Sequence, residues 1–330
     1  MQAAALFAAG YADLRARVPA MPAKWGRPAT VLPLLAELEQ SDPMAGAFRG
    51  EQLVGYLGGK LHPARSGGEK AVYCAEWAHA VAATESDRGW IYSKLYEELG
   101  AAWVARGCHR QALTMLASDP AGLEAWVWLG FGMLVVDMVR STDGPGEDLA
   151  GGPTGTSDAN LTIRTATPAD LKALFPVAAA HEVYYRQSPM FLPNTAMTDP
   201  TELESTLADP QTVTWLAVDH RDGVIGFMRG ELGAQNACQV VRDVDTLACT
   251  GAFVLPAARR RGAGRMLMAA MVDWARDNGL ARLALDFESA NIYGRAFWQR
   301  HLTPVCYSVL RVVDSRIAGT GSGSGTEAGG

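Results

Sequence analysis

The feature that most constrains the fold is a polar stretch near the middle of the chain. Residues 141–160 read STDGPGEDLAGGPTGTSDAN, which is rich in Gly, Pro, Ser and Thr and has no hydrophobic period. This composition is typical of a linker, because it offers no helical or strand face to bury. The linker leaves a segment 1–140 and a segment 161–315, each about the size of one domain. The remainder, 316–330, is mostly Gly, Ser and Thr and is expected to form a disordered tail.

Composition and charge exclude two broad classes of function. The chain of 330 residues is 48% apolar and carries a formal net charge of −6, so nucleic-acid binding, which depends on neutralising phosphates, is not expected. The longest apolar run, 126–136, is shorter than the ~20 residues of a membrane-spanning helix. The N-terminus lacks the basic region of a signal peptide. Five scattered cysteines without a CxxC pair favour a cytoplasmic protein and predict no metal site.

The two segments resemble each other in places that keep the same order. Residues 53–61 (LVGYLGGKL) parallel 224–232 (VIGFMRGEL), and 133–139 (MLVVDMV) parallel 308–313 (SVLRVV). Between them, WVAR at 103–106 parallels WAR at 274–276. Matches in a constant order favour a duplicated domain over chance similarity between two α/β domains.

The second segment has the pattern β-α-β-β-β-α-β-α-β. A Thr-Pro pair at 167–168, with Asp three residues after the Thr, predicts a helix start, and Gly223 predicts the turn of a hairpin. An apolar face that includes Met266 and Trp274 predicts a helix ending at Asn278 and Gly279. The resulting fold class is α/β, a mixed sheet with helices on its faces. Strands are expected at 161–164, 213–218, 224–232, 246–254, 283–287 and 307–313, the last closing the sheet, and a short helix at 293–300.

The most informative local feature is a strand, a basic turn and a helix at residues 252–267, AFVLPAARRRGAGRML. Two glycines let the backbone approach a ligand closely, and the first N–H groups of the helix have no internal partner. Together with the helix dipole and four arginines, they predict an anion site suited to a diphosphate. A P-loop would need Gly-Lys-Ser/Thr, and a dinucleotide fingerprint would need Gly in place of Leu267. A solvated basic turn without a ligand is the alternative interpretation.

This turn resembles motif A of the GNAT superfamily of acyl-CoA N-acyltransferases. Residues 254–264 (VLPAARRRGAG) are similar to the family's Gln/Arg-x-x-Gly-x-Gly/Ala pattern. Residues 291–298 (NIYGRAFW) resemble its Asn-x-x-Ala-x-x-Phe-Tyr helix. The resemblance covers about 161–314. It implies two GNAT-like domains, each a mostly antiparallel mixed sheet flanked by helices, of which the first is degenerate.

The resemblance also implies roles for the matching positions. Backbone groups around Phe253 and Val254 would pair with the pantetheine arm and orient the thioester carbonyl. Asn291 would contact the cofactor near its thiol end, and Phe297 would pack beside the pantetheine. The diphosphate would be held by Arg259, Arg260, Arg261, Gly262, Ala263, Gly264 and Arg265.

The sequence departs from the family pattern where acid–base chemistry is expected. Trp298 stands where a Tyr often protonates the leaving thiolate, and an indole N–H is not a usable acid. The Gly-Phe pair that commonly follows this helix is absent after His301. Ala248 and Cys249 lie near the place where some members carry a basic carboxylate. The resemblance therefore leaves the general acid and base unassigned.

Three other side chains are candidates for catalysis. Glu182 and Tyr185 continue a 4-3-4-3 series of positions that starts at Leu171, which places Glu182 on an otherwise apolar helix face. An inward carboxylate is costly unless it is paired or functional, although a bend in the helix that solvates it is the alternative. Asp286 lies near a strand end that faces the expected cleft, where it could recognise an amine or cap a loop.

Aromatic residues near Glu182 have two interpretations as well. Tyr184 and Tyr185, with His181, could line an acceptor pocket or could be core residues with satisfied polar tips. Asp245, near another strand end, could likewise recognise an amine or cap a loop.

The first segment matches the family less well. Its expected diphosphate turn is replaced by residues 85–90 (ESDRGW), whose two carboxylates would repel a phosphate. We therefore expect this segment not to bind acyl-CoA and to have a structural or substrate-shaping role.

The sequence as a whole predicts an N-acetyltransferase. The expected reaction moves an acetyl group from acetyl-CoA to a primary amine of a small molecule or peptide, by direct transfer in a ternary complex. Direct transfer needs juxtaposition and a modest acid–base set rather than an enzyme nucleophile. A homo-oligomer is left open. One alternative is a non-catalytic acyl-CoA-binding sensor or scaffold, and another is a pathway acyltransferase resembling the tandem-GNAT mycothiol synthases.

Overall fold

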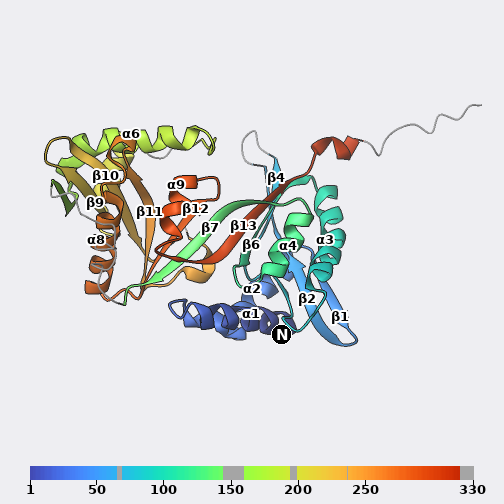
Figure 1. Ribbon diagram of the computed structural model, residues 1–330. Coiled ribbons are helices and arrows are strands. Elements are labelled where there is room, and N and C mark those ends of the chain that lie inside the picture. The colour runs from blue at the N-terminus through green and yellow to red at the C-terminus, as the bar shows by residue number, and fades with distance from the viewer. Residues whose placement is uncertain (65–68, 144–159, 194–198, 236, 320–330) are drawn as a thin grey trace, which may run out of the picture. The chain divides into compact units, whose positions relative to one another are not determined.

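The computed structural model describes residues 1–64, 69–143, 160–193, 199–235 and 237–319 (Figure 1). The chain divides into two compact units. The first unit comprises 1–17, 23–134 and the residues from Cys306 on, and the second comprises 18–22 and 135–305. Most of the predicted linker and the end of the predicted tail lie outside the described residues. The start of that tail forms a 3₁₀ helix, Ser315–Gly319.

The second unit is built on a sheet in the order β7–β12–β11–β10–β9–β8. Neighbouring strands are antiparallel except β11 and β12, which run parallel. The predicted α/β class is confirmed, because helices cover both faces of this mixed sheet. The strands are β7 (Gly132–Ser141), β8 (Leu161–Thr165), β9 (Thr212–Asp219), β10 (Gly223–Leu232), β11 (Thr246–Val254) and β12 (Arg282–Glu288).

Helices of the second unit begin and end at local signals. The predicted capping box of Thr167 and Asp170 is present before α6 (Leu171–Arg186), and Gly279 adopts φ +72° after α8 (Ala263–Asp277). The short α9 (Ile292–Trp298) lies within one residue of its predicted start, whereas α7 (Pro200–Ala208) was not predicted.

The helices of the second unit pack on opposite faces of the sheet. Phe227 and Phe253 form a core cluster with Leu174 of α6. The other face of β10 approaches α8, because a Cβ at Gly230 would lie 3.1 Å from Met271.

The first unit contains a parallel strand pair of its own. β4 and β6 run parallel, β3 joins β4, and β1, β2 and β5 form a separate antiparallel sheet. Aromatic rings in edge-to-face contact, including Tyr96 of α3 with Trp126 and Phe131, pack in the core of this unit. The elements are α1 (Gln2–Arg17), α2 (Pro28–Ser41), β1 (Met44–Arg49), β2 (Gln52–Gly58), β3 (Lys60–His62), β4 (Lys70–Cys74), β5 (His79–Val81), α3 (Arg88–Ala105), β6 (Cys108–Leu116), α4 (Pro120–Trp128) and β13 (Thr303–Val312).

The last strand of each half of the sequence belongs to the other unit. Residues 135–141 of β7 pair with β12, from Val135 opposite Glu288 to Ser141 opposite Arg282. Residues 306–312 of β13 pair with β6. The prediction that 307–313 closes the sheet of the second segment is therefore wrong, and the compact units differ from the predicted segments 1–140 and 161–315. The two strands have similar apolar sequences, so their pattern alone could not say which strand each one pairs with.

This exchange of strands predicts the behaviour of a cut chain. A protease site placed within 144–159 and then cleaved should leave both fragments in one complex, because β7 of the first fragment pairs with β12 of the second and β13 of the second pairs with β6 of the first. Size-exclusion chromatography in native buffer should show the two fragments eluting together at the mass of the intact chain. The segment 161–330 expressed alone should aggregate, since β12 would become an unpaired edge. Fragments that separate in native buffer would contradict the exchange.

No helix in the ranges that the structure describes combines the length and apolar character needed to cross a membrane.

Candidate active site

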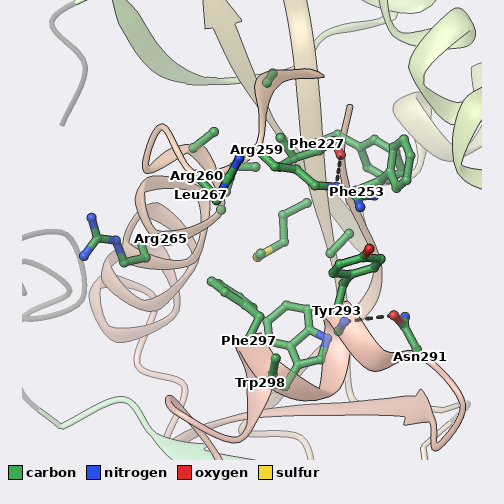
Figure 2. Close-up of a pocket in the computed structure, with 18 of the residues that line it drawn as sticks. Phe227, Phe253, Arg259, Arg260, Arg265, Leu267, Asn291, Tyr293, Phe297 and Trp298 are labelled. Atoms are coloured by element: carbon green, nitrogen blue, oxygen red, sulfur yellow. Dashed lines mark hydrogen bonds between the residues drawn. The ribbon is translucent and has the colours of Figure 1, made fainter. Parts of the chain in front are cut away.

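A cleft of about 530 Å³ opens in the second unit beside the end of β11 and the starts of α8 and α9 (Figure 2). The β11–β12 pairing explains its position, because the register runs only from Thr246 opposite Arg282 to Cys249 opposite Leu285. Beyond these residues, β11 keeps β10 as its partner but has no register partner on β12. Ten of the predicted cofactor-binding residues line the cleft: Phe253, Val254, Arg259, Arg260, Gly262, Ala263, Gly264, Arg265, Asn291 and Phe297.

A β-bulge marks the point where the two strands part. The register between β10 and β11 shifts between Arg229 and Gly230, which leaves Thr250 without an opposite residue. The Arg229 guanidinium holds this bulge, donating from Nε to Thr250 Oγ1 at 2.9 Å and from Nη2 to the Thr250 carbonyl at 3.0 Å. The bulge and the loss of pairing together expose one backbone edge of β11 to the cleft.

The turn before α8 forms a cradle for an anion. Gly262 is the N-cap of α8 at φ +93°, in the left-handed region that glycine tolerates best. Within the described residues, no acceptor is found for the backbone N–H groups of Gly262, Ala263 and Gly264. A Cβ at Gly264 would lie 3.4 Å from the ring of Phe297, so glycine at this position lets the start of α8 approach the Phe297 ring closely. Free N–H groups at a helix N-terminus fit a diphosphate.

The arginines of this turn do not act together as the sequence suggested. Arg259 Nε donates to the Val254 carbonyl at 3.1 Å, and its guanidinium lies over the rings of Tyr293 and Tyr184 at 5.1 and 5.3 Å. Arg261 forms an ion pair with Asp219 and does not line the cleft. The Arg261 side chain is thus engaged by Asp219, and its place in the diphosphate-binding loop stays a prediction. Its spacing in the sequence could not reveal Asp219, which is 42 residues away.

Two further lining residues had not been assigned a role. Arg300 and His301 follow α9 and line the cleft together with Arg265. Burial lowers the pKa of His301, and the charges of Arg140, Arg265 and Arg300 lower it further, so its ring is neutral at neutral pH. The position of Arg300 and His301 one turn after the Asn291 motif was the only signal of them in the sequence.

This arrangement predicts different effects for two neighbouring arginines. Arg265→Ala should weaken CoA binding by about tenfold, as expected for the loss of one charge-assisted contact, and the effect should shrink in high salt. Arg261→Ala should leave CoA affinity nearly unchanged and lower the thermal stability, because Asp219 loses its partner. Isothermal titration and thermal melts of both variants measure the two effects. If Arg261→Ala lost more CoA affinity than Arg265→Ala, the assignment of Arg265 to the cofactor site would be contradicted.

Asn291 links α6 and α9 beside the cleft. Its Oδ1 accepts from the Gly294 N–H at 2.8 Å, which caps α9, and from the Tyr184 hydroxyl at 2.9 Å. Asn291 therefore positions α9 against α6, and only its amide nitrogen is left for a cofactor contact. Trp298 lies beside Phe297, with the ring centroids 4.7 Å apart, and lines the cleft.

Carboxylates gather where β11 and β12 separate. Asp286 and Glu288 share one face of β12, being two residues apart, and Asp137 of β7 lies opposite Asp286 in the register. The Asp286 side chain reaches solvent, but surrounding protein desolvates it and raises its pKa to about 6, and the charge of Glu288 adds to this. The Tyr185 hydroxyl hydrogen-bonds to Glu288, and burial, followed by this charge, raises its pKa far above the usual range. The structure thus brings two predicted residues, Tyr185 and Asp286, together with Glu288, which had not been predicted.

None of the three predicted catalytic residues, Glu182, Tyr185 and Asp286, is among the residues that line the cleft. Glu182 is buried at 1% exposure, as its face of the helix predicted, but it pairs with Arg186 at 2.5 Å and does not line the cleft. His181 and Tyr184 do line it, and burial lowers the pKa of His181 to about 4, so its ring is neutral. Asp245 is engaged in an ion pair with Arg282.

Comparisons with known proteins agree with this site. Residues 178–302 match the model of the family described as Acetyltransferase (GNAT) family. A search of curated proteins finds no match. Two similar solved structures are GCN5-related N-acetyltransferases. The one from Sphaerobacter thermophilus is 16% identical with a TM-score of 0.48, covering 81% of this chain and 80% of that one. The one from Kribbella flavida is 14% identical with a TM-score of 0.43, covering 86% and 94%.

The strand gap and the start of α8 both lie within residues 178–302, the part of the chain that matches the GNAT model. This part of the chain therefore carries a GNAT acetyltransferase domain, which supports an acyltransferase activity.

Proposed function

We propose that the protein transfers an acetyl group from acetyl-CoA to a primary amine of a small molecule or peptide, without a covalent enzyme intermediate. The observation that carries this proposal is the position of the carboxylates Asp286 and Glu288 just beyond the last paired residues of β11 and β12. The cradle of α8 would hold the diphosphate of the donor.

The chain's own groups can supply the requirements of direct transfer. The unpaired edge of β11 near Phe253 offers backbone groups that hold the donor arm and polarise the thioester carbonyl. Holding donor and amine in contact lowers the barrier by up to ~7–11 kcal/mol in favourable cases. No step requires a nucleophilic side chain, and Cys249 is buried with a raised pKa, which makes it unsuited to that role.

Asp286 is proposed as the general base. With a pKa of about 6 it is ionised at neutral pH and still basic enough to take a proton from the incoming ammonium. The free amine then attacks the carbonyl carbon and the C–N bond forms. The positively charged nitrogen of the adduct releases its second proton to solvent, the C–S bond breaks, and the CoA thiolate takes a proton from solvent. Tyr185, which keeps its proton, is proposed to donate a hydrogen bond to the charge that develops during transfer.

Release of free CoA thiol tests the proposal directly. The protein is incubated with acetyl-CoA and a panel of primary amines, and the thiol is measured with a chromogenic disulfide. Turnover is expected with at least one amine and is expected to fall with secondary alcohols of the same shape, which lack the basic nitrogen. Acetyl-CoA binding without turnover on any amine would instead support the acyl-CoA-binding sensor or scaffold.

A further inference from the structure

His181 of α6 packs against the strand that forms one wall of the cleft. Its ring lies tilted against the ring of Phe253 in β11, with the centroids 5.0 Å apart. The rings of Phe227 and Tyr185 meet it edge to face at 5.8 and 4.9 Å. The side chain is 6% exposed and lines the cleft. Three aromatic neighbours therefore hold the imidazole in a fixed position at the cleft wall.

The backbone of β11 beside this ring turns two N–H groups toward the cleft. The Leu255 N–H donates to the Ile225 carbonyl of β10 at 2.9 Å. Backbone groups of successive residues in an antiparallel strand point to alternate sides, so those of Phe253 also face β10, and those of Ala252 and Val254 face away from it. At these positions β12 no longer pairs with β11, and both residues line the cleft. A thioester bound along this edge would therefore lie next to the ring that packs on Phe253.

His181 also contacts a residue that binds the acidic cluster of Asp286 and Glu288. The ring of Tyr185 meets the imidazole, and the Tyr185 hydroxyl hydrogen-bonds to Glu288. The imidazole thus touches one residue of the donor strand and one residue next to the cluster. The carbonyl carbon of the thioester must lie between these two features, because the amine has to reach it. His181 is therefore placed beside the reacting group.

The two ring nitrogens of His181 have different surroundings. Nδ1 is buried and has no hydrogen-bond partner within the described residues, whereas Nε2 is not enclosed in this way. Burial, and after it the charge of Arg229, lower the pKa of His181 to about 4, so the ring is neutral at neutral pH and only one nitrogen carries a proton. A proton on Nδ1 would be a buried donor without an acceptor, which is the costlier arrangement, so we assign the proton to Nε2. Nε2 then presents an N–H donor to the cleft.

We propose that the Nε2–H group of His181 donates a hydrogen bond to the carbonyl oxygen of the bound thioester. It acts on that oxygen together with a backbone N–H of β11. The inference rests on the proposed acetyl transfer, to which it adds a hydrogen-bond donor. When the amine attacks, negative charge grows on the oxygen, and a donor that is already in place stabilises it. The imidazole keeps its proton throughout, because a neutral ring polarises a carbonyl by hydrogen bonding alone.

Kinetics of three variants test the contact. His181→Phe removes the donor and should lower kcat by ~10²–10³-fold, with the dissociation constant of acetyl-CoA nearly unchanged. His181→Gln can place an amide N–H near the position of Nε2 and should recover about tenfold of that loss. Val183→Ala, on the exposed side of the same helix, is the matched control and should leave kcat unchanged. An unchanged kcat in His181→Phe would overturn the proposal, and a raised KM for the amine at that unchanged kcat would show that His181 contacts the acceptor instead.

Thermal melts separate this effect from a structural role. His181→Phe should melt at the wild-type temperature or above it, because phenylalanine keeps the aromatic packing and removes a buried nitrogen that has no partner within the described residues. Its acidic limb in the pH profile should stay where it is in the wild type, since the neutral ring does not titrate there. A low melting temperature that accounts for the lost activity would contradict the proposal.

The carbonyl stretch of bound acetyl-CoA tests the same contact without turnover. With ¹³C at the thioester carbonyl, the infrared band of the wild-type complex should lie at lower frequency than that of His181→Phe, because a hydrogen bond weakens the C=O bond. Equal frequencies would overturn the inference even if amines are acetylated normally. A lower wild-type frequency without turnover on any amine would contradict the proposed function and support the His181 contact. Should His181→Phe not fold, His181→Leu, which also lacks the donor, takes its place in this comparison.

Discussion

Asp286→Asn should lower kcat/KM for amine acetylation by ~10²–10⁴-fold, the usual contribution of a positioned general base. The amide keeps the size of the side chain but cannot accept the proton. The dissociation constant of acetyl-CoA should stay nearly unchanged, because the diphosphate cradle lies at the start of α8 rather than on β12. A fall in affinity with kcat preserved would show that Asp286 shapes the cleft and does not act on the amine.

The pH profile gives an independent test of the same residue. Because the base must be ionised, kcat/KM of the wild type should fall as the pH drops through about 6, the raised pKa of Asp286. Glu288, Asp137 and Tyr185 face the same carboxyl, and Glu288→Gln should shift this acidic limb to lower pH because it removes a like charge. In Asp286→Asn the limb should disappear. A limb that stays in place in both variants would contradict the assignment.

Stability provides the matching control. A carboxyl whose folded pKa lies above its unfolded value opposes folding once it is ionised, so its favourable contribution is present at low pH and is lost as the pH rises through about 6. Asp286→Asn should therefore melt at the same temperature as the wild type or higher at neutral pH. A lost activity in that variant could then not be ascribed to unfolding.

Gly262→Asp should abolish measurable CoA binding. The substitution places a carboxylate at the N-cap of α8, where free N–H groups would meet the diphosphate, and like charges repel at short distance. A loss of affinity of ~100-fold or more is expected, corresponding to about 3 kcal/mol. Isothermal titration with CoA measures it.

The matched control for this variant is Gly262→Asn. Asn has nearly the same shape as Asp and tolerates positive φ about as well, so it reproduces the backbone strain at φ +93° without the charge. The asparagine variant should lose much less affinity than the aspartate variant. If both bind CoA as the wild type does, the diphosphate does not lie at this turn.

Features set by neighbouring residues could be predicted. The capping box of Thr167 and Asp170, the hairpin turn at Gly223 and the bounds of β11 all follow from short-range geometry, and each is present. The turn at Gly262 belongs to the same group, because a left-handed residue before a helix is a local requirement. In contrast, the pairing of Arg261 with Asp219 joins residues far apart in the sequence and left no local trace.

The proposed catalytic residues also depend on contacts between residues far apart in the sequence. An acidic residue on a strand has no distinctive pattern, so Glu288 was overlooked although it binds Tyr185. Glu182 was expected to be buried and is, yet its partner Arg186 gives that burial an ordinary explanation. The hydrophobic period of a helix or strand predicts the face on which a side chain lies, but it does not predict which residue that side chain contacts.

The amino-acid order by itself determined most of the secondary structure of the second segment, the glycine turn before α8 and the family that this turn resembles, because each depends on residues within one or two turns of chain. Tertiary structure alone decided that β7 pairs with β12 and β13 with β6, and which carboxylates gather where β11 and β12 part. Similar apolar strands can pair with several partners, and only the packing of the whole chain selects one of them.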